Sequence, residues 1–427
     1  MNDMRITFEQ AQALAVQAAK VFQPRTPIST QELFAGRWQE ITALADAVGQ
    51  PGLHIVIHGE RGVGKTSLAN VVRPIIRAFD TEGGTLTDVP PRLVIKVNAN
   101  SGDTFSSVWD KMFRDIAWQD DHPTAGLIRG RKSQTSIREA FGLDDKLTVD
   151  EVRRVLSHMP GSVFIIDEFD RAAKETSQEF TDLVKALSDF EIDCTVVVVG
   201  VSETVDQLIA DHASISRSLT QIHLPRMQAG ELREILAKSE KTLSVKFSDE
   251  AANLIVHLSQ GLPHYTHLIG LHSVRTSALK GLSKNIGRKD VFLALKEAVK
   301  QAQQTVAEKH SKATHSTHKE ALFRHVLLAC ALTAALSHDS LGYFNQGAVV
   351  EPLSKILKKD VEFATFSNHL SEFCQEKRGA ILERDGQPRS YRFRFRDPLL
   401  VPFTFMDATA TDLLNEKQLA DMLERSL

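Results

Sequence analysis

The segment 59–66 has the sequence GERGVGKT, a glycine-rich run that ends in a lysine and a threonine. Glycine lets the backbone bend so that successive N–H groups converge on phosphate oxygens, and a following helix adds its positive dipole. The spacing GxxxxGK(S/T) places Lys65 within reach of β- and γ-phosphates and Thr66 as a ligand of Mg²⁺. We therefore predict that ATP or ADP binds to the residues Gly59, Glu60, Arg61, Gly62, Val63, Gly64, Lys65, Thr66 and Ser67.

A second acidic element ends an apolar run in the segment 162–170, SVFIIDEFD. A strand here would carry Asp167 and Glu168 to the carboxyl edge of a sheet, beside the phosphate loop. There Asp167 would hold Mg²⁺ through water, and Glu168 would orient and deprotonate the water that attacks the γ-phosphate. The alternative is that these acids cap the next helix, and Asp170 also fits a cap or a surface position.

The elements that would position these residues are short apolar runs that alternate with helical patterns. Near-continuous runs of Val and Ile are typical of strands that are buried on both faces. The segment 177–190, between two such runs, has apolar residues at the spacing of one helical stripe. This alternation predicts an α/β fold with a parallel five-stranded sheet. The expected strands are 53–58, 92–98, 162–167, 195–200 and 221–224.

Composition narrows the class of protein. The chain has 427 residues and a formal net charge of −3, which excludes a protein that is basic along its whole length. No apolar run in the sequence approaches the ~20 residues that span a bilayer. The three cysteines cannot form a disulfide framework or a paired zinc site. We expect a reduced, cytoplasmic protein that does not contact a membrane.

Changes of pattern along the chain predict its organisation. At roughly 150 residues per domain, the length predicts two to three domains. After residue 225 the strand pattern stops and helical patterns follow. We expect an N-terminal helix and linker (1–32), an α/β nucleotide-binding domain (33–226), a helical lid domain (227–305), a linker (306–319), a winged-helix domain (320–410) and a C-terminal helix (411–427).

The order of these elements resembles the AAA+ ATPases, and more narrowly their origin-recognition and STAND (signal-transduction ATPase) relatives. The resemblance covers about residues 33–305 and extends to the C-terminal domain. The run LFAGR at 33–37 is similar to the (F/L)xGR box of this group, which implies that Phe34, Gly36 and Arg37 lie beside the adenine. The alternative for this run is a glycine turn before a helix.

The resemblance implies roles for two further residues. Ser202, which ends the fourth expected strand, is placed like the sensor-1 residue that hydrogen-bonds the attacking water or the γ-phosphate. Arg217 matches an arginine finger, a planar cation that stabilises transition-state charge, often in trans from a neighbouring subunit. An arginine finger that acts in trans implies that the protein forms a homo-oligomer or a hetero-oligomer. The alternatives are that Ser202 caps the helix 203–209 and that Arg217 is a surface arginine.

The segment 258–268, LSQGLPHYTHL, departs from the origin-recognition pattern. In those proteins a comparable turn is followed by the sensor-2 arginine, and the matching residue here is His264. The triplet Gly261-Leu262-Pro263 instead resembles the GxP motif of STAND ATPases, which implies that Pro263 and His264 lie near the nucleotide. Without the arginine, we expect slow hydrolysis. The alternative is a Gly-Pro helix start with surface histidines.

The C-terminal segment 320–407 resembles a winged helix and carries a basic ribbon. Residues 376–396 contain seven basic and three acidic side chains, a local charge of +4. In a strand, Arg392, Arg394 and Arg396 would share one face and could contact phosphates of double-stranded DNA. The candidates for DNA contact are Arg384, Arg389, Arg392 and Arg394. The alternatives are a solvated strand face and a surface that contacts protein.

Three functions remain open from the sequence. The first is an ATPase that assembles on DNA or on a partner protein under nucleotide control. The second is a STAND-like switch between ADP and ATP forms, with slow turnover and a winged helix used for protein contacts. The third is a scaffold that nucleotide stabilises and that turns over little. All three need ATP or ADP together with Mg²⁺.

Overall fold

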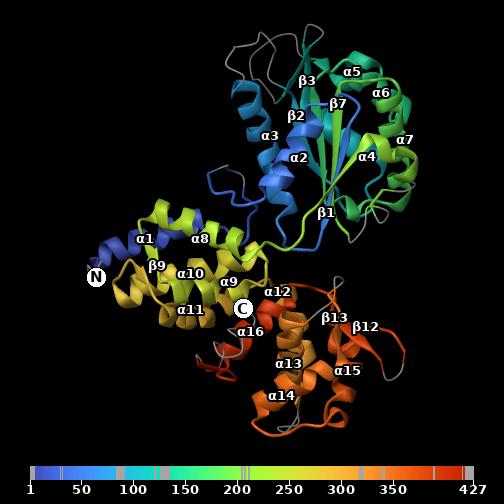
Figure 1. Cartoon of the computed structure of the whole chain (residues 1–427). Coiled ribbons are helices and arrows are strands. Elements are labelled where there is room, and N and C mark those ends of the chain that lie inside the picture. The colour runs from blue at the N-terminus through green and yellow to red at the C-terminus, as the bar shows by residue number, and fades with distance from the viewer. Residues whose placement is uncertain are drawn as a thin grey trace. The chain divides into compact units, whose positions relative to one another are not determined.

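The computed structural model describes residues 5–28, 30, 32–82, 92–119, 122–125, 135–202, 205, 208–209, 212–316, 322–337, 339, 342–387, 390–415 and 417–418. The chain divides into two compact units (Figure 1). One unit is Pro27–Pro225, and the other joins Met1–Thr26 to Arg226–Leu427. Each unit is described by itself below.

A five-stranded parallel sheet forms the centre of the unit Pro27–Pro225. Its order is β2 (Val94–Asn98), β6 (Ser162–Asp167), β7 (Cys194–Val201), β1 (His54–Gly59) and β8 (Leu219–His223). Every residue of β1 and β6 is buried, as their continuous apolar runs require. The predicted α/β fold with a parallel five-stranded sheet is confirmed.

Helices cover both faces of this sheet (Figure 1). On one face, α4 (Phe105–Arg114), α6 (Val149–Leu156) and α7 (Lys174–Asp189) share an apolar core with the strands. Trp109 of α4 lies at the middle of it, with ring centroids 5.3 Å from Phe164 and 6.1 Å from Phe180. On the other face lie α2 (Trp38–Val48) and α3 (Lys65–Glu82). The core thereby holds β1 and α3 on either side of the phosphate loop.

An additional small sheet follows α4 and was not expected from the sequence. It consists of β3 (Ile116–Gln119), β4 (His122–Ala125) and β5 (Thr135–Ser136), and the helix α5 (Ile137–Phe141) comes next. These strands are too short and too polar to produce a period-two pattern, so no sequence signal distinguishes them from a loop.

The second unit begins with α1 (Phe8–Val21), which packs along α10 (Pro263–Gly281) and against α8 (Ala229–Leu243). The contact is close: a Cβ at Gly270 would lie 2.5 Å from the ring of Phe22. The helices α9 (Asp249–Ser259) and α11 (Arg288–Gln301) complete this group, and β9 (Lys246–Phe247) pairs with β10 (Asn285–Ile286). The helices expected over residues 230–304 are therefore present.

The segment 306–319, expected to be a linker, is largely helical. The helix α12 covers Gln304–Thr314, and its residues Val306, His310 and Ala313 are buried. Their spacing follows one helical face, but most residues around them are polar, so the sequence did not show a clear helical pattern. Residues 317–319 lie outside the described part of the chain.

The C-terminal elements begin with α13 (Phe323–Leu336), α14 (Val350–Leu357) and α15 (Ser367–Phe373). A three-stranded antiparallel sheet accompanies them, in the order β11 (Phe344–Asn345), β13 (Arg392–Phe395) and β12 (Leu382–Asp385). The strand β11 was not expected. The helix α16 (Leu400–Ala410) packs against both α11 and α13. Most of the expected helix 411–427 lies outside the described residues.

Among the described residues, none of the helices combines the length and the apolar character that crossing a membrane requires.

We predict that Gly59→Ala destabilises the unit Pro27–Pro225. Gly59 has φ +150°, and an added Cβ would lie 2.4 Å from the carbonyl oxygen of Leu224. Backbone strain and displacement of the chain after β8 should together cost about 1–3 kcal/mol. Chemical denaturation measures the change. Gly49→Ala is the matched control, because its φ is −75° and it should change stability by no more than about 0.5 kcal/mol. Equal effects of the two substitutions would contradict the prediction.

Candidate functional site

The phosphate loop connects the end of β1 to the start of α3. Three of its glycines have positive φ: Gly59 at 150°, Gly62 at 88° and Gly64 at 102°. Residues with a Cβ rarely adopt these conformations, so the glycines allow the tight bend that precedes the helix. Gly59 also forms an isolated β-bridge with Ser202, at the end of β7. The loop is therefore joined to the neighbouring strand at its first residue.

Lys65 lies folded onto the loop. Its Nζ donates hydrogen bonds to the carbonyl oxygens of Gly59 at 2.9 Å and Glu60 at 2.7 Å, and only 8% of the residue is exposed. Burial lowers the pKa of Lys65 to about 8, although the negative charges of Asp170 and Asp167 act against this. The ammonium is thus held next to the backbone N–H groups of the loop. A phosphate would offer it stronger acceptors than two carbonyls.

Arg37, which directly precedes α2, contacts the phosphate loop. Its guanidinium donates to the carbonyl oxygens of Val63 at 3.2 Å and Pro225 at 2.6 Å, and it pairs with Glu40 at 3.1 Å. The residue is 3% exposed. Arg37 therefore connects α2, the phosphate loop and the segment after β8. The neighbouring Phe34 is half-buried, and Gly36 has φ 64°.

Asp167 ends β6 and is 2% exposed. Its Oδ1 accepts a hydrogen bond from the backbone N–H of Glu168 at 2.9 Å. Its Oδ2 lies 2.8 Å from Nζ of Lys96, yet it receives no well-directed hydrogen bond from the described residues. A buried carboxylate oxygen that still lacks a directed donor has capacity for a further ligand. Ser202 is similar, because its buried Oγ has no partner among the described residues.

Glu168 follows Asp167 in a left-handed backbone conformation, with φ 55°. Such a conformation is strained for a residue with a Cβ. Its Oε2 accepts a hydrogen bond from Nη1 of Arg171 at 2.7 Å, and both side chains are about half exposed. Asp170 instead accepts a hydrogen bond from the N–H of Val201 at 2.8 Å, so it acts as a cap for β7.

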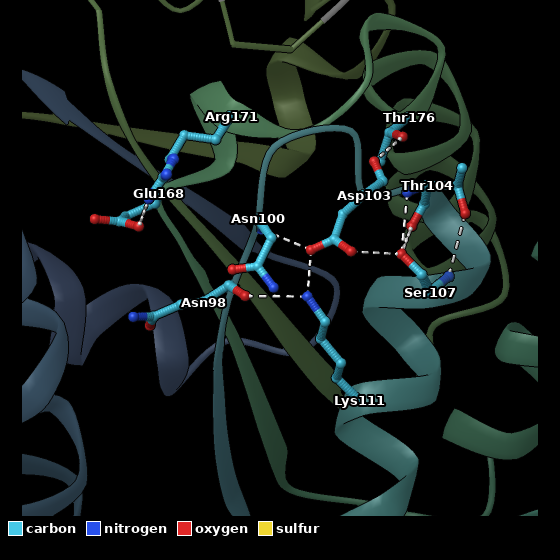
Figure 2. A network of polar contacts seen from close by, with 9 residues as sticks. All are labelled: Asn98, Asn100, Asp103, Thr104, Ser107, Lys111, Glu168, Arg171 and Thr176. Carbon is cyan, nitrogen blue, oxygen red and sulfur yellow. Dashed lines mark hydrogen bonds and ion pairs between the residues drawn. The ribbon is translucent and has the colours of Figure 1, made fainter.

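Figure 2 shows a polar network in the loop after β2 and, separately, the pair formed by Glu168 and Arg171. Asp103 is the centre of the network: it pairs with Lys111 and accepts hydrogen bonds from Asn100 N–H at 2.5 Å and Ser107 Oγ at 2.9 Å. Partial burial acts against ionisation, but these donors outweigh it and lower the pKa of Asp103. Its carbonyl oxygen accepts from Thr176 at 3.1 Å. Gly102 N–H donates to the Arg171 carbonyl at 3.2 Å, which connects the network to the partner of Glu168.

The structure also places the predicted arginine finger and the remaining residues that are predicted to bind nucleotide. Arg217 is in the 3₁₀ helix His212–Ser218, and its side chain is 85% exposed with only a 3.7 Å contact to Asp189. Pro263 is the first residue of α10, and Nδ1 of His264 lies 2.6 Å from the carbonyl oxygen of Pro24. Pro263 and His264 belong to the second unit, so their position beside the loop stays a prediction. Thr66 and Ser67 are in the first turn of α3, where Ser67 Oγ accepts from Ile28 N–H at 3.1 Å.

The arginines predicted to contact DNA have partners of their own within the protein. Arg392 pairs with Asp339 at 2.8 Å and with Asp385, and Arg394 pairs with Glu383 at 2.9 Å. The guanidinium of Arg384 lies 4.4 Å from the centre of the Tyr391 ring. Arg389 lies outside the described residues. Glu383 and Asp385 are already counted in the local charge of +4, while Asp339, outside residues 376–396, adds a further negative charge beside Arg392.

Three residues of the site were missed by reasoning from the sequence. Lys96 pairs with Asp167, Arg171 pairs with Glu168, and Asp103 organises the loop beside them. Only Lys96 left a signal, as the single charged residue within the apolar run LVIKV. A charge inside a buried strand needs a partner, which could have prompted the search.

This arrangement fits a nucleotide phosphate with a divalent cation. Backbone N–H groups and the Lys65 ammonium suit phosphate oxygens. The oxygens of Thr66 and Asp167 suit Mg²⁺, which is a hard cation that prefers oxygen ligands. The buried hydroxyl of Ser202 could donate to a phosphate or to a water.

We predict that the affinity for ADP falls as the pH rises through 8. If the ammonium of Lys65 binds phosphate, its charge matters for affinity, and near its pKa of about 8 the nucleotide-free protein begins to lose that proton. Binding of nucleotide must then be coupled to uptake of a proton by the Lys65 amine, so the Kd should rise roughly tenfold between pH 7 and 9. Fluorescence titration at both values measures this.

The control for the pH dependence is Lys65→Arg. Arginine stays charged throughout this range, so the variant should keep a constant Kd. A constant Kd in the unmodified protein would contradict the assignment of Lys65.

With the geometry described, the chain can be compared with known proteins. No curated protein matches it. Among solved structures, it is similar to Orc1 of Aeropyrum pernix in complex with DNA, at 16% identity over 92% of this chain and 97% of that one, with a TM-score of 0.46. It is also similar to Aeropyrum pernix ORC2 (15% identity, 95% and 98% covered, TM-score 0.49). A third similar structure is the Thermotoga maritima RuvB Holliday junction branch migration motor (15% identity, 85% and 93% covered, TM-score 0.42).

The match to a family model is decisive. The model described as Novel STAND NTPase 1 matches residues 25–335, which is more than half of the chain. This segment includes the phosphate loop, Asp167, Glu168, Ser202 and Arg217. It also confirms the resemblance to the STAND group that the sequence motifs indicated. The chain therefore belongs to the family of novel STAND NTPases.

Proposed function

We propose that this protein binds ATP and ADP with Mg²⁺ at the loop 59–66 and acts as a nucleotide-controlled switch with slow hydrolysis. The observation that carries the proposal is the position of Lys65. Its ammonium is buried against the Gly59 and Glu60 carbonyls, between a loop of positive-φ glycines and the acids Asp167 and Asp170. A cation in such surroundings is suited to recognise phosphate.

In the proposed reaction, Glu168 orients the attacking water and takes its proton. Asp167 and Thr66 would hold Mg²⁺, which neutralises charge on the phosphates when it is bound. Two features support slow turnover. Glu168 is engaged by Arg171 at 2.7 Å, so it must leave this pair to act as a base. In addition, His264 stands where the resemblance to origin-recognition proteins would place the sensor-2 arginine. The proposed role of Ser202 is to hydrogen-bond the γ-phosphate or the water.

Assembly in the ATP form would use Arg217. Its side chain is 85% exposed and its ion pair with Asp189, at 3.7 Å, is itself exposed to solvent, so the guanidinium could exchange this partner for a nucleotide in an adjacent subunit. We propose that α13–α15 and the sheet β11–β13–β12 form a winged helix. Because Arg392 and Arg394 already pair with acids, this sheet favours protein contacts over DNA. A DNA phosphate would have to replace those ion pairs.

We predict that the protein is larger with ATP than with ADP, and that Arg217→Ala prevents this increase while nucleotide binding persists. Size measurement by gel filtration with light scattering tests the prediction, with and without duplex DNA. The control is Arg114→Ala, which removes an exposed arginine of α4 in the same unit. Addition of duplex DNA should not change the measured size of the protein with either nucleotide.

Each contrary result removes one part of the proposal. Equal sizes with ATP and ADP would contradict the switch. Assembly of Arg217→Ala at the wild-type level would contradict the finger. Assembly that requires DNA, and that is lost on reversing the charge of Arg384 and Arg394, would replace the protein partner by DNA.

A further inference from the structure

Lys96 lies in β2, the edge strand of the central sheet. The strand is otherwise largely buried, and the Lys96 side chain is 23% exposed. Its Nζ reaches across to the end of the adjacent strand β6, where it lies 2.8 Å from Oδ2 of Asp167. It also donates a hydrogen bond to Oδ1 of Asn70, on α3, at 2.6 Å.

This contact gives Asp167 a counter-ion from the protein itself. The carboxylate is almost fully buried, and a buried charge is strongly unfavourable unless an opposite charge compensates it. In a site designed around Mg²⁺ alone, the metal would be that compensation. Here an ammonium from the protein already provides a positive charge at the same oxygen.

The geometry also leaves the pair open to exchange. The hydrogen bond of Lys96 is directed at Asn70, while Asp167 Oδ2 receives no well-directed hydrogen bond from the described residues. Asn70 could retain the ammonium if the carboxylate turned to another cation. Lys96 thus compensates the charge without saturating the oxygen.

We propose that Lys96 is a built-in cation that competes with Mg²⁺ for Asp167 and allows the protein to hold a nucleoside diphosphate without the metal. This proposal rests on nucleotide binding at the phosphate loop. It adds a regulatory property to that site: the resting ADP form stays bound when Mg²⁺ is removed. Because Mg²⁺ must displace Lys96, its contact with Asp167 contributes less binding free energy than a contact with an unpaired carboxylate would.

The test compares the Kd of a fluorescent ADP analogue in EDTA with its Kd in Mg²⁺. In the unmodified protein the ratio of the Kd in EDTA to the Kd in Mg²⁺ should be small, because ADP stays bound without the metal. In Lys96→Met the ratio should rise roughly tenfold, which corresponds to ~1.4 kcal/mol, because Asp167 then depends on the metal. Thermal unfolding supplies a second readout: Mg²⁺ with ADP should raise the unfolding temperature more in Lys96→Met than in the unmodified protein.

Two variants complete the experiment. Lys111→Met is the matched control, since Lys111 pairs with Asp103 outside the metal ligands, and its ratio should stay at the wild-type value. If Lys96→Met does not fold, Lys96→Gln can be used, because its amide keeps a hydrogen-bond donor at this position while it removes the positive charge.

The outcomes separate the two proposals. An unchanged ratio in the Lys96 variants, with ADP bound normally, would overturn the role of Lys96 and leave the proposed function intact. Failure of the unmodified protein to bind ADP in either condition would overturn both.

Discussion

Parallel pairing of β1, β6 and β7 brings the carboxyl ends of three strands to one edge of the sheet, and the candidate site depends on this register. Gly59 ends β1, Asp167 ends β6, and Ser202 follows β7. The bridge between Gly59 and Ser202 fixes the loop to the third of these strands. A shift by one residue in any strand would turn these side chains towards the opposite face.

Charge within this edge is balanced by residues of the protein itself. Lys65 contacts loop carbonyls, Lys96 compensates Asp167, and Arg171 engages Glu168. Lys65, Asp167 and Glu168, three of the proposed functional residues, therefore already have partners within the protein. In the proposed switch, Mg²⁺ and the attacking water would have to replace Lys96 at Asp167 and Arg171 at Glu168. This property suits a slow switch better than a rapidly cycling motor.

The sequence was sufficient for the elements whose signal is local. The strands 162–167 and 195–200 are continuous apolar runs, and the loop 59–66 has a fixed spacing of glycines and lysine. It was not sufficient for contacts between distant residues: Lys96 meets Asp167 across two strands, and Arg37 reaches Pro225 from the far end of the unit. The helix α12 was missed because its apolar face is narrow. The ion pair between Arg392 and Asp339 was missed because Asp339 lies outside residues 376–396, over which the charges were counted.

The most direct test of the account is single-turnover hydrolysis of ATP by Glu168→Gln, together with its affinity for ATP. The account predicts an unchanged affinity, because among the described residues the Glu168 side chain pairs with Arg171 and not with the loop 59–66. It also predicts hydrolysis slower by about 100-fold or more, because the general base is lost. Hydrolysis at the wild-type rate with normal ATP binding would contradict it, since the base would then have to be another residue.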